Sequence, residues 1–224
     1  TFTLDNGFMS PVAQQNIAEM LPRLNVDHLF IKPHDKFYKK LFRYAITHLN
    51  EEGGYGTVDF SDGEFLLDTA RNLAAEKKIP LILCGYSKYQ VQNGLKINQF
   101  ESPREKELAD RVATAGLNIK DIFQDENDLA LWWQASKQNP NDVARLVFPL
   151  FAWDLEEGQI KDKVKEWGLM NAKNHSPIVT NHQLVALLGV VDVHQLGYSS
   201  FEHEFCRMIR EGKALKSEWQ PIFE

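Results

Sequence analysis

The stretch Pro80-Leu81-Ile82-Leu83-Cys84-Gly85 decides the fold class. Its apolar residues form an unbroken run that ends at a glycine. Continuous apolar runs of this length are typical of strands that are covered on both faces within a parallel sheet, whereas half-exposed strands alternate apolar with polar residues. We therefore predict a buried parallel strand over residues 79–84.

Further strands alternate with helices along the chain. Residues 1–4, 28–32 and 148–153 have the apolar character of strands, and the last of them is weakened by Pro149, which cannot donate a ladder hydrogen bond. This alternation predicts an α/β fold in which helices cover both faces of a parallel sheet. The predicted helices cover residues 10–24, 35–48, 63–77, 102–115, 125–137, 140–147, 156–167, 181–190 and 199–211.

The chain of 224 residues is long enough for one sizeable core. We predict an α/β domain over residues 1–155, and a helical region over residues 156–224 that packs on the same domain.

Composition narrows the classes of function. The formal net charge of −6 argues against broad electrostatic binding to nucleic acid or to an anionic membrane. The two cysteines, Cys84 and Cys206, exclude a disulfide framework and a four-cysteine zinc site. No apolar run approaches the roughly 20 residues that span a bilayer. We therefore expect a cytoplasmic protein.

Two segments follow predicted strands, where parallel sheets place their ligands. Asp5-Asn6-Gly7 offers a carboxylate, an amide and a flexible glycine, which could hold a ribose or the edge of an adenine. Gly85 allows close approach to the backbone, and Ser87 and Lys88 could meet phosphate oxygens. On local chemistry alone, an ordinary turn is the favoured interpretation of Asp5-Asn6-Gly7.

The remaining candidate residues match no known metal-binding or catalytic motif. His175, His182, His194, His203 and Cys206 crowd the C-terminal part, but their spacing matches no zinc signature. The phosphate-binding patterns GxxxxGK[ST] and GxGxxG are absent, and so is the GxSxG pattern of hydrolases. The sequence identifies no general base.

Several motifs, in order, resemble those of the PP-loop ATP pyrophosphatases, the adenine-nucleotide α-hydrolase-like superfamily. FTLDNGF at residues 2–8 resembles the second strand of that fold, and residues 10–24 resemble the helix after it. The branch it resembles is the N-acetyl sugar amidotransferase-like proteins, which are linked to lipopolysaccharide biosynthesis. The other similar stretches are residues 79–90 (IPLILCGYSKYQ), 148–169 (FPLFAWDLEEGQIKDKVKEWGL), 176–184 (SPIVTNHQL) and 201–212.

The resemblance implies ATP with Mg²⁺, a small substrate such as a sugar, and ammonia from a glutaminase partner. An adenylated oxygen-bearing carbon would be attacked by nitrogen, with release of AMP. It implies nucleotide contacts at Asp5, Asn6, Gly7 and Gly85, and phosphate or substrate contacts at Ser87 and Lys88. Two alternatives remain open: a sulfur transferase or tRNA-modifying enzyme of the same fold, which would use Cys84, and a degenerate domain without catalysis.

The loop that defines this family, Ser-Gly-Gly-x-Asp-Ser, is absent from these 224 residues. In the family it follows a central strand that lies between the second and fourth strands, so we expect a sheet that lacks its middle. Exposed strand edges invite pairing with other chains. A homo-oligomer is therefore among the expected assemblies.

We expect the 224-residue chain alone not to convert ATP into AMP and pyrophosphate. Release of pyrophosphate needs backbone N–H donors around the β- and γ-phosphates, usually from a glycine-rich loop at a helix N-terminus. The glycine-rich stretch present, Gly53-Gly54-Tyr55-Gly56, follows a predicted helix and not a core strand. Chromatographic separation of nucleotides after incubation with ATP and Mg²⁺ checks this; turnover by a folded monomer would contradict it.

Overall fold

The computed structural model describes residues 1–48, 58–110, 113–114, 117–153, 155–169, 183–199 and 202–223. The chain forms two compact units. The first unit contains Thr1–Tyr38 and Leu155–Glu224, and the second contains Lys39–Asp154. The first 38 residues thus group with the C-terminal segment that we predicted to be a separate helical region.

The first unit opens with a strand–helix–strand element. Strand β1 (Phe2–Leu4) pairs in parallel with β2 (Leu29–Ile31), and α1 (Pro11–Leu24) connects them. Helix α1 begins as predicted, because the Ser10 hydroxyl accepts a hydrogen bond from the Ala13 N–H and Pro11 occupies the first helical position. These strands and this helix confirm the sequence prediction for the N-terminal segment.

The C-terminal part of the first unit is helical. Its described helices are α8 (Glu157–Glu166), α10 (Val185–Leu196), α11 (Glu202–Arg210) and α12 (Lys216–Phe223). The rings of Phe205 and Trp219 stack with their centroids 3.5 Å apart, and the ammonium of Lys161 lies 5.5 Å from the Trp219 ring centroid. Aromatic packing therefore joins α8, α11 and α12, although α12 was not predicted.

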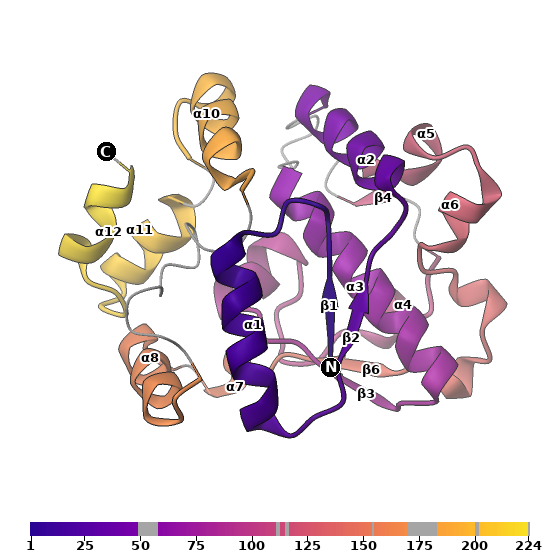
Figure 1. Cartoon of the computed structure of the whole chain (residues 1–224), viewed down its shortest axis with the longest axis horizontal. Coiled ribbons are helices and arrows are strands. Elements are labelled where there is room, and N and C mark those ends of the chain that lie inside the picture. Colours follow the sequence, from indigo (N-terminus) through magenta and orange to yellow (C-terminus); the bar gives the residue numbers. More distant parts are fainter. Residues whose placement is uncertain are drawn as a thin grey trace. The chain divides into compact units, whose positions relative to one another are not determined.

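The second unit is built around a parallel pair of strands, β3 (Leu81–Leu83) and β6 (Arg145–Val147), which lie side by side in Figure 1. Ile82 is the register partner of Leu146. Ile82 and Cys84 pack on a core cluster that includes Leu67 of α3 (Val58–Lys77). The other members of this cluster are Val91, Ile97, Leu146 and Phe148.

Shorter elements complete the second unit. Helix α2 (Asp35–Thr47) enters it from the first unit. The others are the π-helical turn Gln90–Gly94, α4 (Arg104–Glu107), the antiparallel pair β4 (Ala113–Thr114) and β5 (Leu117–Asn118), α5 (Ile119–Ile122), α6 (Glu126–Ala130), the 3₁₀ turns Ala135–Lys137 and Pro140–Asp142, and α7 (Pro149–Trp153).

The predicted strand at residues 148–153 is wrong. The strand lies earlier, at Arg145–Val147, inside a segment predicted as helix, and Pro149–Trp153 is helical. Proline lacks the N–H that a sheet would use, but it suits the first turn of a helix, where that N–H has no partner. Similarly, the predicted helix at residues 102–115 is reduced to the four residues of α4.

The described strands are parallel in two pairs, but a large parallel sheet with helices on both faces is not shown. Strand β3 was expected to be covered on both faces, yet Leu81 is 46% exposed and Leu83 is 67% exposed. The reason is the two-residue period of a strand, which turns Ile82 toward the core and its two neighbours to the other face. Within the described ranges, no helix is long and apolar enough to cross a membrane.

A buried carboxylate closes the outer edge of β6. The Leu146 N–H donates to Glu107 Oε1 at 2.8 Å, and the Ser102 N–H donates to the Leu146 carbonyl at 2.8 Å. Glu107 is 1% exposed, and its Oε2 lies 3.0 Å from Arg104 Nη1 and 3.5 Å from Arg145 Nε. A side chain therefore supplies the acceptor that a neighbouring strand would otherwise provide.

We expect Glu107→Ala to lower the free energy of unfolding by about 3–5 kcal/mol, because it leaves the Leu146 N–H and Arg104 without their acceptor and removes the negative charge that faces Arg145. The matched control is Glu105→Ala, two residues away, where the side chain is exposed. It should change the free energy of unfolding by no more than about 0.5 kcal/mol. Urea denaturation measures the free energy of unfolding of both variants. Equal stability of the two variants would show that Glu107 does not stabilise the outer edge of β6.

Candidate functional site

The first predicted segment, Asp5-Asn6-Gly7, lies directly after β1. Asp5 Oδ1 accepts a hydrogen bond from the Gly7 N–H at 2.8 Å, and Asn6 Oδ1 accepts one from the Phe8 N–H at 2.9 Å. Gly7 has a φ of +83°, which side-chain-bearing residues rarely adopt. The turn interpretation therefore explains part of this sequence, since the side chains of Asp5 and Asn6 stabilise their own backbone.

Asp5 also keeps a polar surface that a ligand can reach. Its side chain is 31% exposed, and Lys32 Nζ lies 3.5 Å from its Oδ2. Lys32 follows β2, so the carboxyl ends of both paired strands carry a charged residue. Asn6 is buried, at 8% exposure, and its main contribution is to the turn.

The second predicted segment, Gly85 to Lys88, lies directly after β3. The Ser87 N–H donates to Gln90 Oε1 at 2.9 Å, and the Gln90 N–H donates to Ser87 Oγ at 3.1 Å. The ammonium of Lys88 lies 5.7 Å from the Phe151 ring centroid. A Cβ at Gly85 would meet no atom within 4 Å, so the backbone there is open to close approach.

The two segments belong to different units, because Asp5, Asn6 and Gly7 lie in the first and Gly85, Ser87 and Lys88 in the second. A cleft shared by both segments stays a prediction. Each segment by itself has the position expected of a ligand-binding loop, at the carboxyl end of a parallel strand.

The residues fit the base or ribose of a nucleotide better than its phosphates. The open backbone at Gly7 and Gly85 suits close approach of a flat group. The Ser87 N–H is already bonded to Gln90, so a phosphate would have to displace that bond. Among the described residues no group of three His, Cys, Asp or Glu side chains could hold a metal ion. Mg²⁺ commonly takes only one or two protein carboxylates beside phosphates and waters, and Asp5 could supply one.

The histidine-rich C-terminal part provides no further candidate. His175 and His182 lie outside the described residues, as does the glycine-rich stretch at residues 52–56. The ring of His203 packs edge-on against Tyr198 with centroids 4.8 Å apart, which is a packing contact.

Cys84 does not have the surroundings of a reactive thiol. Burial raises the pKa of the Cys84 thiol to about 11, against the opposing effects of the Tyr86 N–H and the charge of Arg71. At pH 8 about one molecule in a thousand would carry the thiolate, the form that attacks electrophiles. The thiol instead packs against the core cluster beneath β3.

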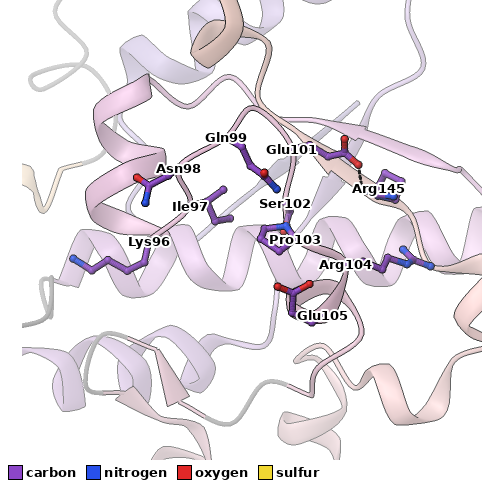
Figure 2. Close-up of a pocket in the computed structure, with 10 residues that line it drawn as sticks. All are labelled: Lys96, Ile97, Asn98, Gln99, Glu101, Ser102, Pro103, Arg104, Glu105 and Arg145. Carbon is purple, nitrogen blue, oxygen red and sulfur yellow. Dashed lines mark ion pairs between the residues drawn. The ribbon is translucent and has the colours of Figure 1, made fainter.

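Sequence reasoning missed a cavity in the second unit, which we call the 96–105 cavity (Figure 2). Its volume is about 530 Å³, and an ion pair between Glu101 and Arg145 crosses its rim. Residues 102–105 of this segment lie in the helix predicted over residues 102–115, and Arg145 lies in the one predicted over residues 140–147. Only the parallel pairing of β3 with β6 brings Arg145 beside it. The lining residues are Lys96, Ile97, Asn98, Gln99, Glu101, Ser102, Pro103, Arg104, Glu105 and Arg145.

A scan of the sequence against models of known protein families found no match, and a search of curated proteins found none either. The resemblance to PP-loop ATP pyrophosphatases therefore stays a hypothesis that rests on the motifs quoted above.

We expect iodoacetamide at pH 8 to modify the exposed thiol of Cys206 and to leave Cys84 unreacted. Because the pKa of Cys84 is raised to about 11, its labelling should increase only as the pH approaches that value. Peptide mass spectrometry after timed labelling measures the modification of both cysteines. In the Cys206→Ser variant, only the slow labelling of Cys84 remains to be measured. Fast labelling of Cys84 at pH 8 would contradict this and would favour the sulfur-transfer alternative.

Proposed function

We propose that this chain is the nucleotide-binding part of an ATP-dependent, amidotransferase-like enzyme. The observation that supports the proposal is the position of its two candidate loops. Asp5-Asn6-Gly7 follows β1 and Gly85 follows β3, each at the carboxyl end of a strand in a parallel pair. Ligands of parallel α/β sheets bind beyond those ends.

The division of the strands also supports the proposal. In the fold that the motifs resemble, the strand bearing the phosphate loop lies between the strands corresponding to β1 and β3. The described strands form one pair that contains β1 and another that contains β3. This pattern is what a sheet without that strand would leave.

The reaction proposed is adenylation followed by amination. An oxygen of the substrate, a sugar or another small molecule, attacks the α-phosphorus of ATP and pyrophosphate leaves. Ammonia from a glutaminase partner then attacks the activated carbon, and AMP leaves with the former substrate oxygen. ATP with Mg²⁺ supplies the good leaving group that the substrate lacks.

The chain's own residues would position these groups. The Asp5 carboxylate would accept hydrogen bonds from ribose hydroxyls or join the Mg²⁺ shell, and Lys32 Nζ lies 3.5 Å from its Oδ2. Gly7 in the first unit and Gly85 in the second would each allow a nucleotide to approach the backbone closely. Ser87 and Lys88 would face the phosphates or the substrate once the Ser87–Gln90 hydrogen bonds open.

The alternatives predict different products. Sulfur transfer would need a reactive thiol, and the raised pKa of Cys84 argues against it as the nucleophile. A domain without catalysis would bind ATP and leave it intact. Phosphorus NMR of the complete protein with ATP, Mg²⁺, ammonium and a panel of sugars distinguishes amidotransfer, which should release AMP and pyrophosphate, from binding without catalysis. ATP that stays intact with every sugar of the panel would contradict the proposed reaction.

Asp5→Asn in the complete protein should weaken ATP binding by about tenfold, because it removes a charged acceptor. The amide oxygen of asparagine can still accept the Gly7 N–H, so the turn is retained. Isothermal titration calorimetry measures the affinity. The matched control is Asp27→Asn, an exposed carboxylate that precedes β2 at the opposite end of the strand pair.

Asp5→Ala removes both the charge and the turn contact, so it should weaken ATP binding at least as much. If only Asp5→Ala weakens binding, the carboxylate serves the turn alone, and its assignment to the nucleotide is wrong. Unchanged affinity in both variants would contradict any role of Asp5 in binding.

A further inference from the structure

The 96–105 cavity lies wholly within the second unit and does not include the residues assigned to the nucleotide. Its volume of about 530 Å³ is within the range of about 300–1,000 Å³ that small-molecule sites occupy. Figure 2 shows Glu101 pointing toward Arg145, with Lys96 at the opposite end of the lining. Ile97 and Pro103 supply apolar surface between these charges.

Two buried polar atoms of the lining lack a hydrogen-bond partner in the part of the chain that the structure describes. They are Ser102 Oγ, in a residue with 0% exposure, and Arg145 Nε. Arg145 Nε lies 3.5 Å from Glu107 Oε2, which is close enough for charge attraction but too long for a well-formed hydrogen bond. Buried donors are almost always satisfied in folded proteins, so this pair indicates a ligand with acceptor atoms.

The charges of the lining fall into two groups. Arg104 serves the fold, because it donates to Glu107 at 3.0 Å and to the carbonyls of Val143 and Pro140. Arg145 pairs with Glu101 at the rim, and Arg145 remains 43% exposed and Glu101 33% exposed. Lys96 and Glu105 are exposed farther along the lining. Outside the Arg104–Glu107 pair, cations and acids are therefore balanced.

This balance decides the class of ligand. A phosphate or another multiply charged anion would meet the carboxylates of Glu101 and Glu105 as well as the cations. A ligand that carries both signs would instead complement both members of an ion pair at once. In an α-amino acid the carboxylate and the ammonium are attached to the same carbon, which suits a guanidinium and a carboxylate that are in direct contact.

We infer that the 96–105 cavity binds a small zwitterion of the α-amino acid class. The ligand carboxylate lies against the guanidinium of Arg145, where it supplies the acceptor that Nε lacks. The ligand ammonium lies against the carboxylate of Glu101, and the amides of Asn98 and Gln99 contact its side chain. The Ser102 hydroxyl turns toward the ligand carboxylate when the site is filled.

The test is a titration of the isotopically labelled 224-residue chain, followed by amide NMR. Glycine and L-glutamine are the zwitterionic probes. Acetate carries only the negative charge, methylammonium only the positive charge, and glycerol neither. We expect both amino acids to shift resonances within residues 96–105 and at Arg145, and each single-charge probe to bind about tenfold more weakly or less. This result would stand whether or not the complete protein uses ATP.

Two substitutions assign the effect to named groups. Glu101→Gln keeps the shape and removes the acid that faces the ammonium, and should weaken glycine binding about tenfold. Ser102→Ala removes the buried hydroxyl; in a purely structural role the change would leave binding untouched, whereas here it should weaken binding severalfold. Asn141→Ala, exposed and outside the cavity, is the control and should bind like the original chain.

Several outcomes would overturn the inference. Acetate that binds as tightly as glycine would make the cavity an anion site, and glycerol that does so would make it a site for neutral polyols. The absence of shifts with either amino acid in the millimolar range, or unchanged glycine binding by both Glu101→Gln and Ser102→Ala, would show that the cavity is not an amino-acid site.

Discussion

The carboxylate of Glu107 connects the sheet, the core and the cavity of the second unit. It accepts the Leu146 N–H at the outer edge of β6 and attracts the guanidinium groups of Arg104 and Arg145. At 1% exposure a lone carboxylate would be very costly, so its charge and its lone pairs have to be matched by these partners. Its Oε2 also lies 3.5 Å from Nε of Arg145, which pairs with Glu101 in the lining of the 96–105 cavity.

The outer edge of β6 is hydrogen-bonded, whereas one face of β3 is exposed. Beyond β6, the Ser102 N–H and the Glu107 carboxylate engage the Leu146 backbone. On β3 the exposed face carries Leu81 and Leu83, which are large apolar side chains on a strand of the kind usually covered. The described part of this unit thus contains one parallel pair of strands, with large apolar side chains exposed on one face.

Local structure at the strand ends was predictable because the interactions that stabilise it are local. Ser10 and Pro11 start α1, and Asp5, Asn6 and Gly7 form their turn with contacts that span two residues. The strand prediction at residues 148–153 was wrong because the interactions that decide this segment are not local. Phe-Pro-Leu-Phe-Ala-Trp is apolar enough for either a strand or a helix, and the ladder between β3 and β6 selects the three residues before it as the strand. Once that register is set, Pro149 is left to begin a helix.

The sequence by itself determined the α/β class, the parallel strands at residues 1–4, 28–32 and 79–84, and the turn chemistry after the first of them, since these follow from apolar runs, caps and turn residues within a few positions. Only the tertiary structure decided that β3 is covered on one face, that Glu107 is buried at a strand edge, and that Arg145 meets Glu101 beside Ser102. These features depend on which distant segments share a register. Their energies come from desolvation and pairing across the fold, which the local pattern of residues does not encode.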